Sequence, residues 1–398
     1  MGGELKVVTL KPAELDAQAR ALWARFRDAD PTLASPYFDL RYVLAAGEAA
    51  PDVEVATIRR GGEIVGFLPF QRRGSRIQPV AAPLTDYHGL IAAPGTRIDL
   101  TAVIAGLGAR RFRFCGLVGG EGSRMSAQPL QAMVADLSEG FEAYLTRRPA
   151  SFQKDKRRRA RRLAEDHGPL AFSLSDRDDE ALDYVLRLKR EQLRRSGQHD
   201  VFASPWTLGF LRRLGESRDP DFGLRIAALR AGGRLVAAEV GLRSGPTHHL
   251  WFPVYDPDFA RYSPGALMTL ETMRAAAADG VRLVDFGPMG EPYKRDFAEP
   301  GLCVLEGDVT AGGLVAAART VADLALASAP AARRALSEVG RRLDRRWDRI
   351  AGCEPALEGR LGAASRMLGQ LARRRPKTSL GLGLGIGLSL GLAGLLAE

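Results

Sequence analysis

The chain has 398 residues, of which 45% are hydrophobic and 26% charged. This composition supports two or three packed domains of about 150 residues each and excludes a disordered or collagen-like protein. Its three cysteines form no CxxC pair and its five histidines form no HExxH motif. We therefore expect no disulfide framework, no metal site and a reducing, cytoplasm-facing compartment.

The net charge of +10 is concentrated near the C-terminus. Residues 311–377 contain 14 Lys/Arg against 6 Asp/Glu, whereas residues 1–310 carry a balance of only +3. A nucleic-acid-binding fold usually gathers positive charge on its main domain. We therefore expect no DNA partner, and the near-neutral body also disfavours tRNA, whose phosphates call for a broad basic surface.

Residues 1–150 alternate between strand-like and helical segments, which is typical of an α/β lobe. The expected strands are Lys6–Leu10, Val53–Arg60, Glu63–Gln71 and Arg111–Cys115. The expected helices are Pro12–Ala29 and a segment capped by Ser35 that runs to about Ala50. Two of the strands flank Gly61-Gly62 and alternate apolar and polar residues, the pattern of a β-hairpin.

The second half of the chain repeats this theme. Three antiparallel strands are expected at Leu224–Arg230, Arg234–Leu242 and Thr247–Val254. The first of their turns aligns with the earlier hairpin, Ile58–Gly66 with Leu229–Ala237, at an offset of 171 residues. Hairpin chemistry alone would give such a match, but two copies of one lobe would explain both the match and the chain length. We favour duplication.

A strongly basic segment, Ser151–Gly168, separates the two halves and is expected to be helical. Its basic residues are Lys154, Lys156, Arg157, Arg158, Arg159, Arg161 and Arg162. Positive charge around most of a helix suits a clamp for substrate or cofactor phosphates. A solvated connecting helix fits the same pattern, and both interpretations stay open.

The segment from Trp251 to Phe297 carries the most chemical information. Ser263 is a good helix cap, Pro264 suits the first helical position, and Gly280 is a stop signal. Such a helix start offers the free N–H groups of Gly265 and Ala266 together with the positive end of the helix dipole. It is therefore expected to bind a pyrophosphate.

A buried-type strand, Val281–Phe286, follows this helix and carries Asp285 near its end. The chain then turns into Tyr293-Lys294. The strand–turn–helix–strand order resembles that of GNAT-type acyltransferases. The motifs that carry this resemblance are Tyr255-Asp-Pro, Tyr262-Ser-Pro-Gly-Ala-Leu, Gly280, Asp285-Phe-Gly, Tyr293-Lys294, Phe297 and Asp86-Tyr87-His88-Gly89.

These motifs are most similar to the GNAT branch named for CelD proteins of cellulose biosynthesis, and more distantly to FemABX-type transferases. The resemblance covers about residues 20–310 and is strongest over 140–300. It implies an α/β (α+β) fold of tandem GNAT-like lobes with mixed, mostly antiparallel sheets flanked by helices, plus a helical C-terminal extension. The expected divisions are a degenerate lobe at 1–150, an acyltransferase lobe at 151–310, a basic helical extension at 311–377 and an apolar tail at 378–398.

Family membership implies transfer of an acyl group from an acyl-CoA thioester to an amine or hydroxyl. The expected cofactor-binding residues are Arg261, Ser263, Gly265 and Ala266. The general GNAT phosphate loop reads Gln/Arg-x-x-Gly-x-Gly/Ala, and here Pro264 replaces its first glycine and removes one N–H donor. Coenzyme A binding is the expectation, and a tRNA-borne donor stays open.

Acyl transfer also needs a base and an acid. Our base candidates are Asp285, Glu239 and then His249, and our acid candidates are Tyr293 and Tyr255. Ordinary structural roles fit each of them as well, such as strand exit for the aspartate and core packing for the tyrosines. The expected substrate-binding residues are Lys294, Asp86, Tyr87 and Trp251, and Lys294 could instead pair with a neighbouring carboxylate.

The C-terminal region has two distinct parts. In 336–350 apolar residues recur at helical spacing among arginines, so a helix is expected either to dock on the body or to lie on an anionic membrane. Thr378–Ala397 contains 20 residues without a charge, after the basic run Arg373–Lys377. A membrane anchor and a frayed Gly/Leu tail both fit it. The N-terminus predicts neither a signal peptide nor a lipid site.

Three functions follow from these observations. The first is a cytoplasmic-face acyl-CoA-dependent acyltransferase whose acceptor is a small molecule or a polysaccharide or lipid precursor of the cell envelope. The second is a FemABX-like transferase that uses aminoacyl-tRNA. The third is a non-catalytic GNAT-like scaffold held at a membrane surface by its C-terminus. The chemistry at the predicted helix start favours the first.

Overall fold

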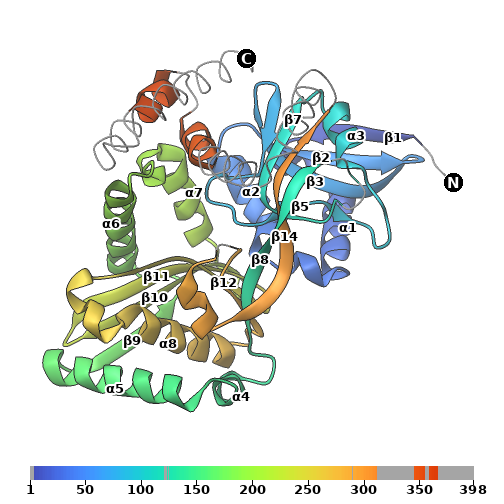
Figure 1. Ribbon diagram of the computed structural model, residues 1–398. Helices are drawn as coiled ribbons and strands as arrows, with labels where there is room; N and C mark the ends of the chain where they lie inside the picture. Colours follow the sequence, from blue (N-terminus) through green and yellow to red (C-terminus); the bar gives the residue numbers. More distant parts are fainter. Residues whose placement is uncertain are drawn as a thin grey trace, which may run out of the picture.

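Two α/β lobes lie side by side and share one mixed β-sheet (Figure 1). The computed structural model describes residues 4–120, 123, 125–288, 290–311, 345–354 and 358–365. Within these residues the sheet has 14 strands, most of them paired antiparallel. The prediction of tandem lobes with mixed, mostly antiparallel pairing and flanking helices is therefore confirmed.

The first lobe is built around the expected Gly-Gly hairpin. Its strands are β1 (Leu5–Leu10), β2 (Val53–Arg60), β3 (Glu63–Arg73), β4 (Arg76–Gln78), β5 (His88–Gly89), β6 (Ile91–Ala92) and β7 (Arg111–Val118). Its helices are α1 (Ala17–Asp28), α2 (Leu40–Ala49) and α3 (Leu100–Gly106). The cap predicted at Ser35 is wrong, because Asp39 accepts the N–H of Arg41 and starts α2 four residues later.

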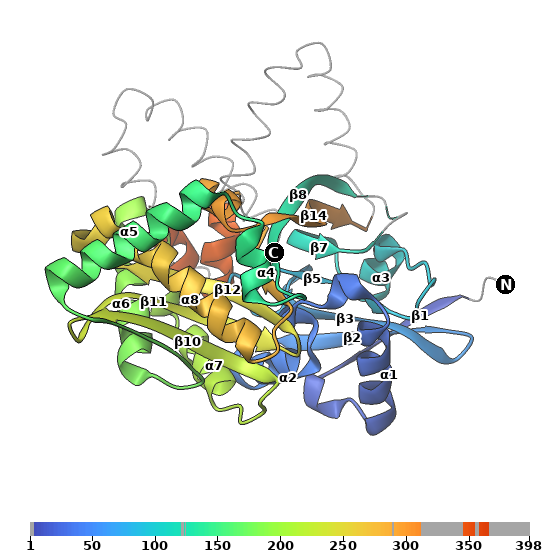
Figure 2. The same ribbon diagram turned by 90° about the horizontal axis from the view of Figure 1, so that it is seen from below.

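The second lobe has helices on both faces of its strands (Figures 1 and 2). Its strands are β9 (Leu170–Ser175), β10 (Phe222–Ala231), β11 (Arg234–Ser244), β12 (Thr247–Tyr255) and β13 (Leu283–Asp285). Its helices are α4 (Phe141–Thr146), α5 (Ala150–His167), α6 (Asp179–Ser196), α7 (Pro205–Gly215) and α8 (Pro264–Ala278). Helices α6 and α7 cover one face, and α5 and α8 cover the other.

Two long strands each leave one lobe and pair with a strand of the other. The sequence did not predict this exchange of strands. β8 (Ser126–Asp136) comes from the segment assigned to the first lobe, yet it pairs with β13 of the second. β14 (Glu299–Thr310) makes the reciprocal crossing and pairs with β7 of the first lobe. The two crossing strands also pair with each other. The sheet is therefore continuous across residue 150, the predicted boundary between the lobes.

The lobes also share apolar packing. Trp23 and Phe67 of the first lobe belong to the same buried cluster as Phe210, Leu242 and Trp251 of the second. Burial of large side chains in one continuous cluster favours a fixed relation between the lobes, because separating them would expose this surface to water. Any site built at the junction of the lobes is consequently held on a rigid support.

Part of the basic C-terminal extension docks at this junction. Residues 345–353 are helical, and Ile350 and Cys353 are buried. The Cys353 carbonyl accepts the Ser204 hydroxyl at 3.0 Å. In this stretch the apolar stripe therefore packs on the body. None of the helices in the described part of the chain combines the length and apolar character needed to cross a bilayer, and the tail at 378–398 lies outside the described residues.

The exchange of strands requires a glycine at position 307. A Cβ on Gly307 would collide with the Ser126 carbonyl oxygen and lie 2.6 Å from Ala127 Cα, both on β8. We expect Gly307→Ala to destabilise the protein by about 1–3 kcal/mol, the usual cost of overpacking. The measurement is thermal or urea unfolding of the full chain.

Gly209→Ala is the matched control, because Gly209 lies in α7 and a Cβ at this position would have no heavy atom within 4 Å. That variant should be as stable as the parent or up to about 1 kcal/mol more stable, since Ala is the better helix former. Equal stability of the two variants would contradict a tight crossing between β8 and β14.

Candidate active site

The parallel strands β12 and β13 part after only three residue pairs. The last pair is His249 with Asp285. β12 then continues to Tyr255 with no strand on that edge among the described residues. On its other edge the register with β11 shifts, so that Val240 faces Phe252 and Gly241 faces Leu250. Trp251 is the extra residue of this bulge, and a bulge leaves backbone groups outside the ladder.

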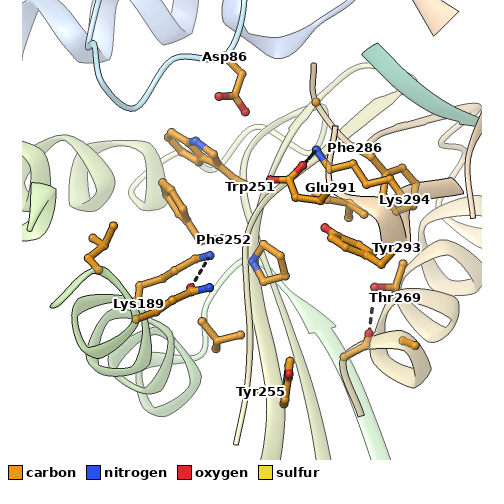
Figure 3. Close-up of a pocket in the computed structure, with 18 of the residues that line it drawn as sticks. Asp86, Lys189, Trp251, Phe252, Tyr255, Thr269, Phe286, Glu291, Tyr293 and Lys294 are labelled. Carbon is orange, nitrogen blue, oxygen red and sulfur yellow. Dashed lines mark hydrogen bonds and ion pairs between the residues drawn. The ribbon is translucent and has the colours of Figure 1, made fainter. Parts of the chain in front are cut away.

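A cavity of about 760 Å³ lies where the strands part (Figure 3). Its floor is β12 from Leu250 to Tyr255, one wall is the N-terminal turn of α8, and the opposite wall is α6. The loop after β13 and the first-lobe segment around Asp86 close the remaining sides. A cleft of this size with a few converging polar groups is the usual form of a small-molecule site.

The tip of α8 differs in detail from the prediction. Ser263 occupies the N-cap position, but it has a left-handed φ of 53° and its side chain makes no capping hydrogen bond. Its carbonyl accepts the N–H of Ala266 at 3.0 Å, so the expected pair of free N–H groups is wrong for Ala266. Ser263 and Gly265 line the cavity. A Cβ on Gly265 would contact only Tyr255, at 3.5 Å, which leaves room for close approach of a ligand.

Arg261 lies outside the cavity. Its side chain is 70% exposed and pairs with Asp166 of α5 at 3.1 Å. From the same helix, Arg159 donates to the Arg261 carbonyl at 2.7 Å, and Lys156 reaches the cavity wall. One face of the basic helix thus lies against the α8 tip, and its cations add positive potential there.

Four of the predicted site residues form one hydrogen-bonded network behind the cavity. The imidazole of His249 lies between Asp285, 3.1 Å from Nδ1, and Asp86, 3.0 Å from Nε2. The other oxygen of Asp285 accepts the Tyr87 hydroxyl and the Gly287 N–H, both at 2.8 Å. Only Asp86 of these carboxylates lines the cavity, and its side chain is 36% exposed.

The charge of His249 follows from its two carboxylate neighbours. The imidazole is fully buried, which by itself would lower its pKa, but Asp285 and Asp86 outweigh burial and raise the pKa to about 9. His249 is therefore protonated at neutral pH, and both of its nitrogens are engaged. Asp285 is enclosed by its own hydrogen bonds, so that Asp86 is the member of this trio that lines the cavity.

Glu239 is the most unusual group near the cavity. Its side chain is on β11 opposite Pro253, it is 1% exposed, and neither carboxylate oxygen has a hydrogen-bond partner among the described residues. Burial raises the pKa of Glu239 to about 8, against smaller opposing effects from His249 and Lys189. A carboxyl group that titrates near neutral pH next to a cavity suits proton transfer.

The remaining predicted residues line the cavity directly. Burial and the nearby carboxylates of Glu239 and Glu291 raise the pKa of Tyr293, which keeps its hydroxyl protonated. The amine of Lys294 is 2.7 Å from Glu291, as one of the sequence interpretations expected. Trp251 is anchored by its indole N–H, which donates to the Leu84 carbonyl of the first lobe at 2.8 Å.

Sequence reasoning missed two cations of this cavity. Lys189 comes from α6 and Arg349 from the helix at 345–353. Neither stands in a recognisable motif, and the spacing of α6 signals only an amphipathic helix. Their position emerges only when the three-dimensional packing brings these helices together.

Comparison with known proteins agrees with the fold. Residues 150–295 match the acetyltransferase (GNAT) domain family. This part of the chain is accordingly similar to GNAT acetyltransferase domains, and the predicted GNAT-like fold is confirmed. No curated protein matches the chain. No cluster of three or more His, Cys, Asp or Glu residues in the described ranges could hold a metal ion.

Several solved structures are similar to this chain at low identity. One is a tandem GNAT protein from the clavulanic acid biosynthesis pathway, with 13% identity, 78% of this chain and 100% of that chain covered, and a TM-score of 0.46. Another is FemX, with 12% identity, coverage of 76% and 96%, and a TM-score of 0.45. A third is L-PGS from Bacillus licheniformis, with 11% identity, coverage of 77% and 94%, and a TM-score of 0.45.

The buried Glu239 carboxyl predicts a stability effect of pH. Its pKa rises from an ordinary 4.5 to about 8 on folding, so the native state binds more protons than the unfolded chain between these values. Stability is therefore lost as the pH rises from 4.5 towards 8. We expect Glu239→Gln to raise Tm at pH 7, by the equivalent of up to roughly 3 kcal/mol, and to leave it nearly unchanged at pH 4.5.

The measurement is a set of thermal melts across this pH range. Glu63→Gln, at an exposed position of the β2–β3 hairpin, is the control and should shift neither curve. A Glu239→Gln effect of the same size at both ends of the range would contradict a buried, neutral carboxyl.

Proposed function

We propose that the protein is an acyltransferase that moves an acyl group from acyl-CoA to an amine or hydroxyl acceptor. The single observation that carries the proposal is the parting of β12 and β13 beside the tip of α8. It leaves a free strand edge, from Leu250 to Tyr255, along a cavity that has a helix N-terminus at one end. An extended amide-containing chain can bind such an edge by main-chain hydrogen bonds.

The residues at the α8 tip fit an anionic group on the donor. Ser263, Gly265 and Lys156 all line the cavity, and the Ser263 hydroxyl makes no capping hydrogen bond. The positive end of the helix dipole adds to them. The bulge at Trp251 supplies backbone N–H groups near the middle of the cavity, where they can polarise a thioester carbonyl.

In this scheme one side chain acts as the general base and another as the general acid. Asp86 accepts the proton of the acceptor amine or hydroxyl as the nitrogen or oxygen bonds to the acyl carbon. The protonated His249, held by Asp285, keeps Asp86 in place. As the carbon–sulfur bond breaks, the Tyr293 hydroxyl gives its proton to the departing thiolate and regains one from solvent. Asp86 is the catalytic base in this scheme, and His249 and Asp285 are positioning residues.

The biological setting is a separate part of the proposal. A polysaccharide or lipid precursor of the cell envelope as acceptor, at the cytoplasmic face of a membrane, is supported by the resemblance to the CelD-like branch. The N versus O specificity of transfer follows from the identity of that acceptor. Donor binding can be tested first, since it does not require the acceptor.

We predict that acyl-CoA raises the Tm of the full chain and that Gly265→Glu abolishes the shift. The larger side chain has room beside Tyr255, but its carboxylate would repel a diphosphate at the helix tip. Gly209→Glu in α7 adds the same charge away from the cavity and should keep the shift. Flat melting curves with acetyl-, malonyl- and longer acyl-CoA would remove the proposal, and a salt-sensitive shift with charged tRNA would favour a FemABX-like donor.

A second prediction concerns Asp86. Asp86→Asn removes the base and one of the two carboxylates that stabilise the imidazolium. We expect thiol release from the bound acyl-CoA, measured with a panel of amines and alcohols, to fall by about 10²–10⁴ in kcat. The pKa of His249, followed by NMR of its ring, should fall below about 9.

Asp221→Asn, at an exposed turn, is the matched control and should change neither quantity. An unchanged His249 titration in Asp86→Asn would refute the network, whereas a lowered His249 pKa with full activity would refute only the role of Asp86 as base.

A further inference from the structure

Two of the cations that line the cavity, Lys189 and Arg349, form no ion pair with a carboxylate among the described residues. The Lys189 amine contacts only the side-chain oxygen of Gln192, at 3.2 Å, and the Arg349 guanidinium contacts that of Gln198. Among the described residues neither forms an ion pair. The other two lysines of the cavity differ in this respect, because Lys294 pairs with Glu291 and Lys156 pairs with Asp155.

These two cations are held out of bulk water at a cost. Loss of hydration lowers the pKa of Lys189, against weaker opposing effects of Glu239 and Glu291. Loss of hydration likewise lowers the pKa of Arg349. A half-buried charge without a directly paired counter-charge is destabilising, and such a charge at a cavity wall is compensated when an anion binds.

The helix that carries Arg349 contacts both lobes, and these contacts fix its position. Within its helix, Arg345 pairs with Glu306 of β14 at 2.7 Å and Asp348 pairs with Arg113 of β7 at 2.8 Å. The Cys353 carbonyl is bound by Ser204. The helix at 345–353 is thereby fixed over the junction of the lobes (Figure 1), and Arg349 lines the cavity.

Lys189 lies on the wall of the cavity opposite α8. Figure 3 shows Lys189 entering from the side of α6, whereas Thr269 of α8 lies on the opposite side and Asp86 at a third edge. Asp86 is close enough to Arg349 to act on its pKa. A ligand here would therefore meet a carboxylate at one point and two cations at others.

We propose that the acceptor is a small molecule that carries both an amine and an anionic group, a carboxylate or a phosphate. Lys189 and Arg349 bind the anionic group, with Gln192 and Gln198 as further donors through their amides. Asp86 attracts the amine as an ammonium, which releases one proton to solvent, and Asp86 then accepts the second proton as the nitrogen bonds to the acyl carbon. This inference rests on the proposed acyltransferase function and adds the class of acceptor to it.

The experiment compares matched acceptors with the full-length protein and the acyl-CoA that gives the largest thermal shift. The phosphate pair is glucosamine 6-phosphate with glucosamine, and the carboxylate pair is alanine with alaninamide. Thiol release gives kcat and KM for each. We expect kcat/KM to favour the charged member of at least one pair by 10-fold or more, and the pair that responds identifies the anionic group.

The variants are Lys189→Gln and Arg349→Gln, with Arg349→Lys as the charge-retaining form. We expect each glutamine variant to raise KM for the charged acceptor by about 10- to 100-fold, with kcat and the acyl-CoA thermal shift unchanged. Arg349→Lys should recover part of the affinity. Arg346→Gln, on the same helix but not in the cavity wall, is the matched control and should behave as the parent.

Three results would overturn the inference, and they are distinguishable from failure of the proposed function. Equal use of charged and neutral acceptors would remove the anion site. Loss of the acyl-CoA shift in the glutamine variants would assign the two cations to the donor instead. If Arg346→Gln raised KM as much as Arg349→Gln does, both effects would come from the general surface charge and not from a specific anion site. Absence of any acyl-CoA shift in the parent protein would instead refute the acyltransferase proposal itself.

Discussion

The contact between His249 and Asp285 lies where the strands β12 and β13 stop pairing, and much of the site depends on it. The two residues are the last pair of the parallel ladder, and their side chains are also hydrogen-bonded. Asp285 in addition accepts the N–H of Gly287, which turns the chain away from β12 with a φ of 82°. A Cβ at Gly287 would lie 3.4 Å from Asp86 and 3.5 Å from His249. Asp285 is therefore the last residue of β13, and its carboxylate orients the His249 imidazolium. Beyond this point β12 has an unpaired edge among the described residues, and that part of β12 forms the cavity floor.

The first lobe contributes residues to this site. It contributes Asp86 and Tyr87 to the network and the Leu84 carbonyl that anchors Trp251. The exchange of β8 and β14 holds these groups in a fixed position relative to the second lobe, because each lobe supplies a strand that pairs with a strand of the other. The shared apolar cluster makes the two lobes one support.

The sequence predicted what depends on near neighbours. Both Gly-Gly hairpins and the run from β12 through α8 to β13 have local signals, since alternation, turn residues and a helix stop lie within a few positions of one another. The contact of Asp86 with His249 spans 163 residues, and the strand exchange is equally non-local, so no spacing rule could reveal either. At the α8 tip the predicted free N–H of Ala266 is instead hydrogen-bonded, because Ser263 has a left-handed backbone conformation and its carbonyl accepts this N–H. The nature of the residues there was foreseeable, but their hydrogen bonding was not.

Three ionisable groups in or near the cavity share one physical property, which is that they have no partner of opposite charge within ion-pair distance among the described residues. Among the described residues Glu239 is buried without a hydrogen-bond partner, and Lys189 and Arg349 have only neutral partners. A chain selected for stability alone would replace such groups by apolar ones of similar size, often with a gain in stability. His249 shows the contrast, since two carboxylates satisfy its charge completely. Of the unsatisfied groups, Lys189 and Arg349 line the cavity that a ligand would fill. Where a fold places uncompensated charges around one cavity, a bound ligand is the natural source of the compensation, and this links the cost in stability to the proposed function.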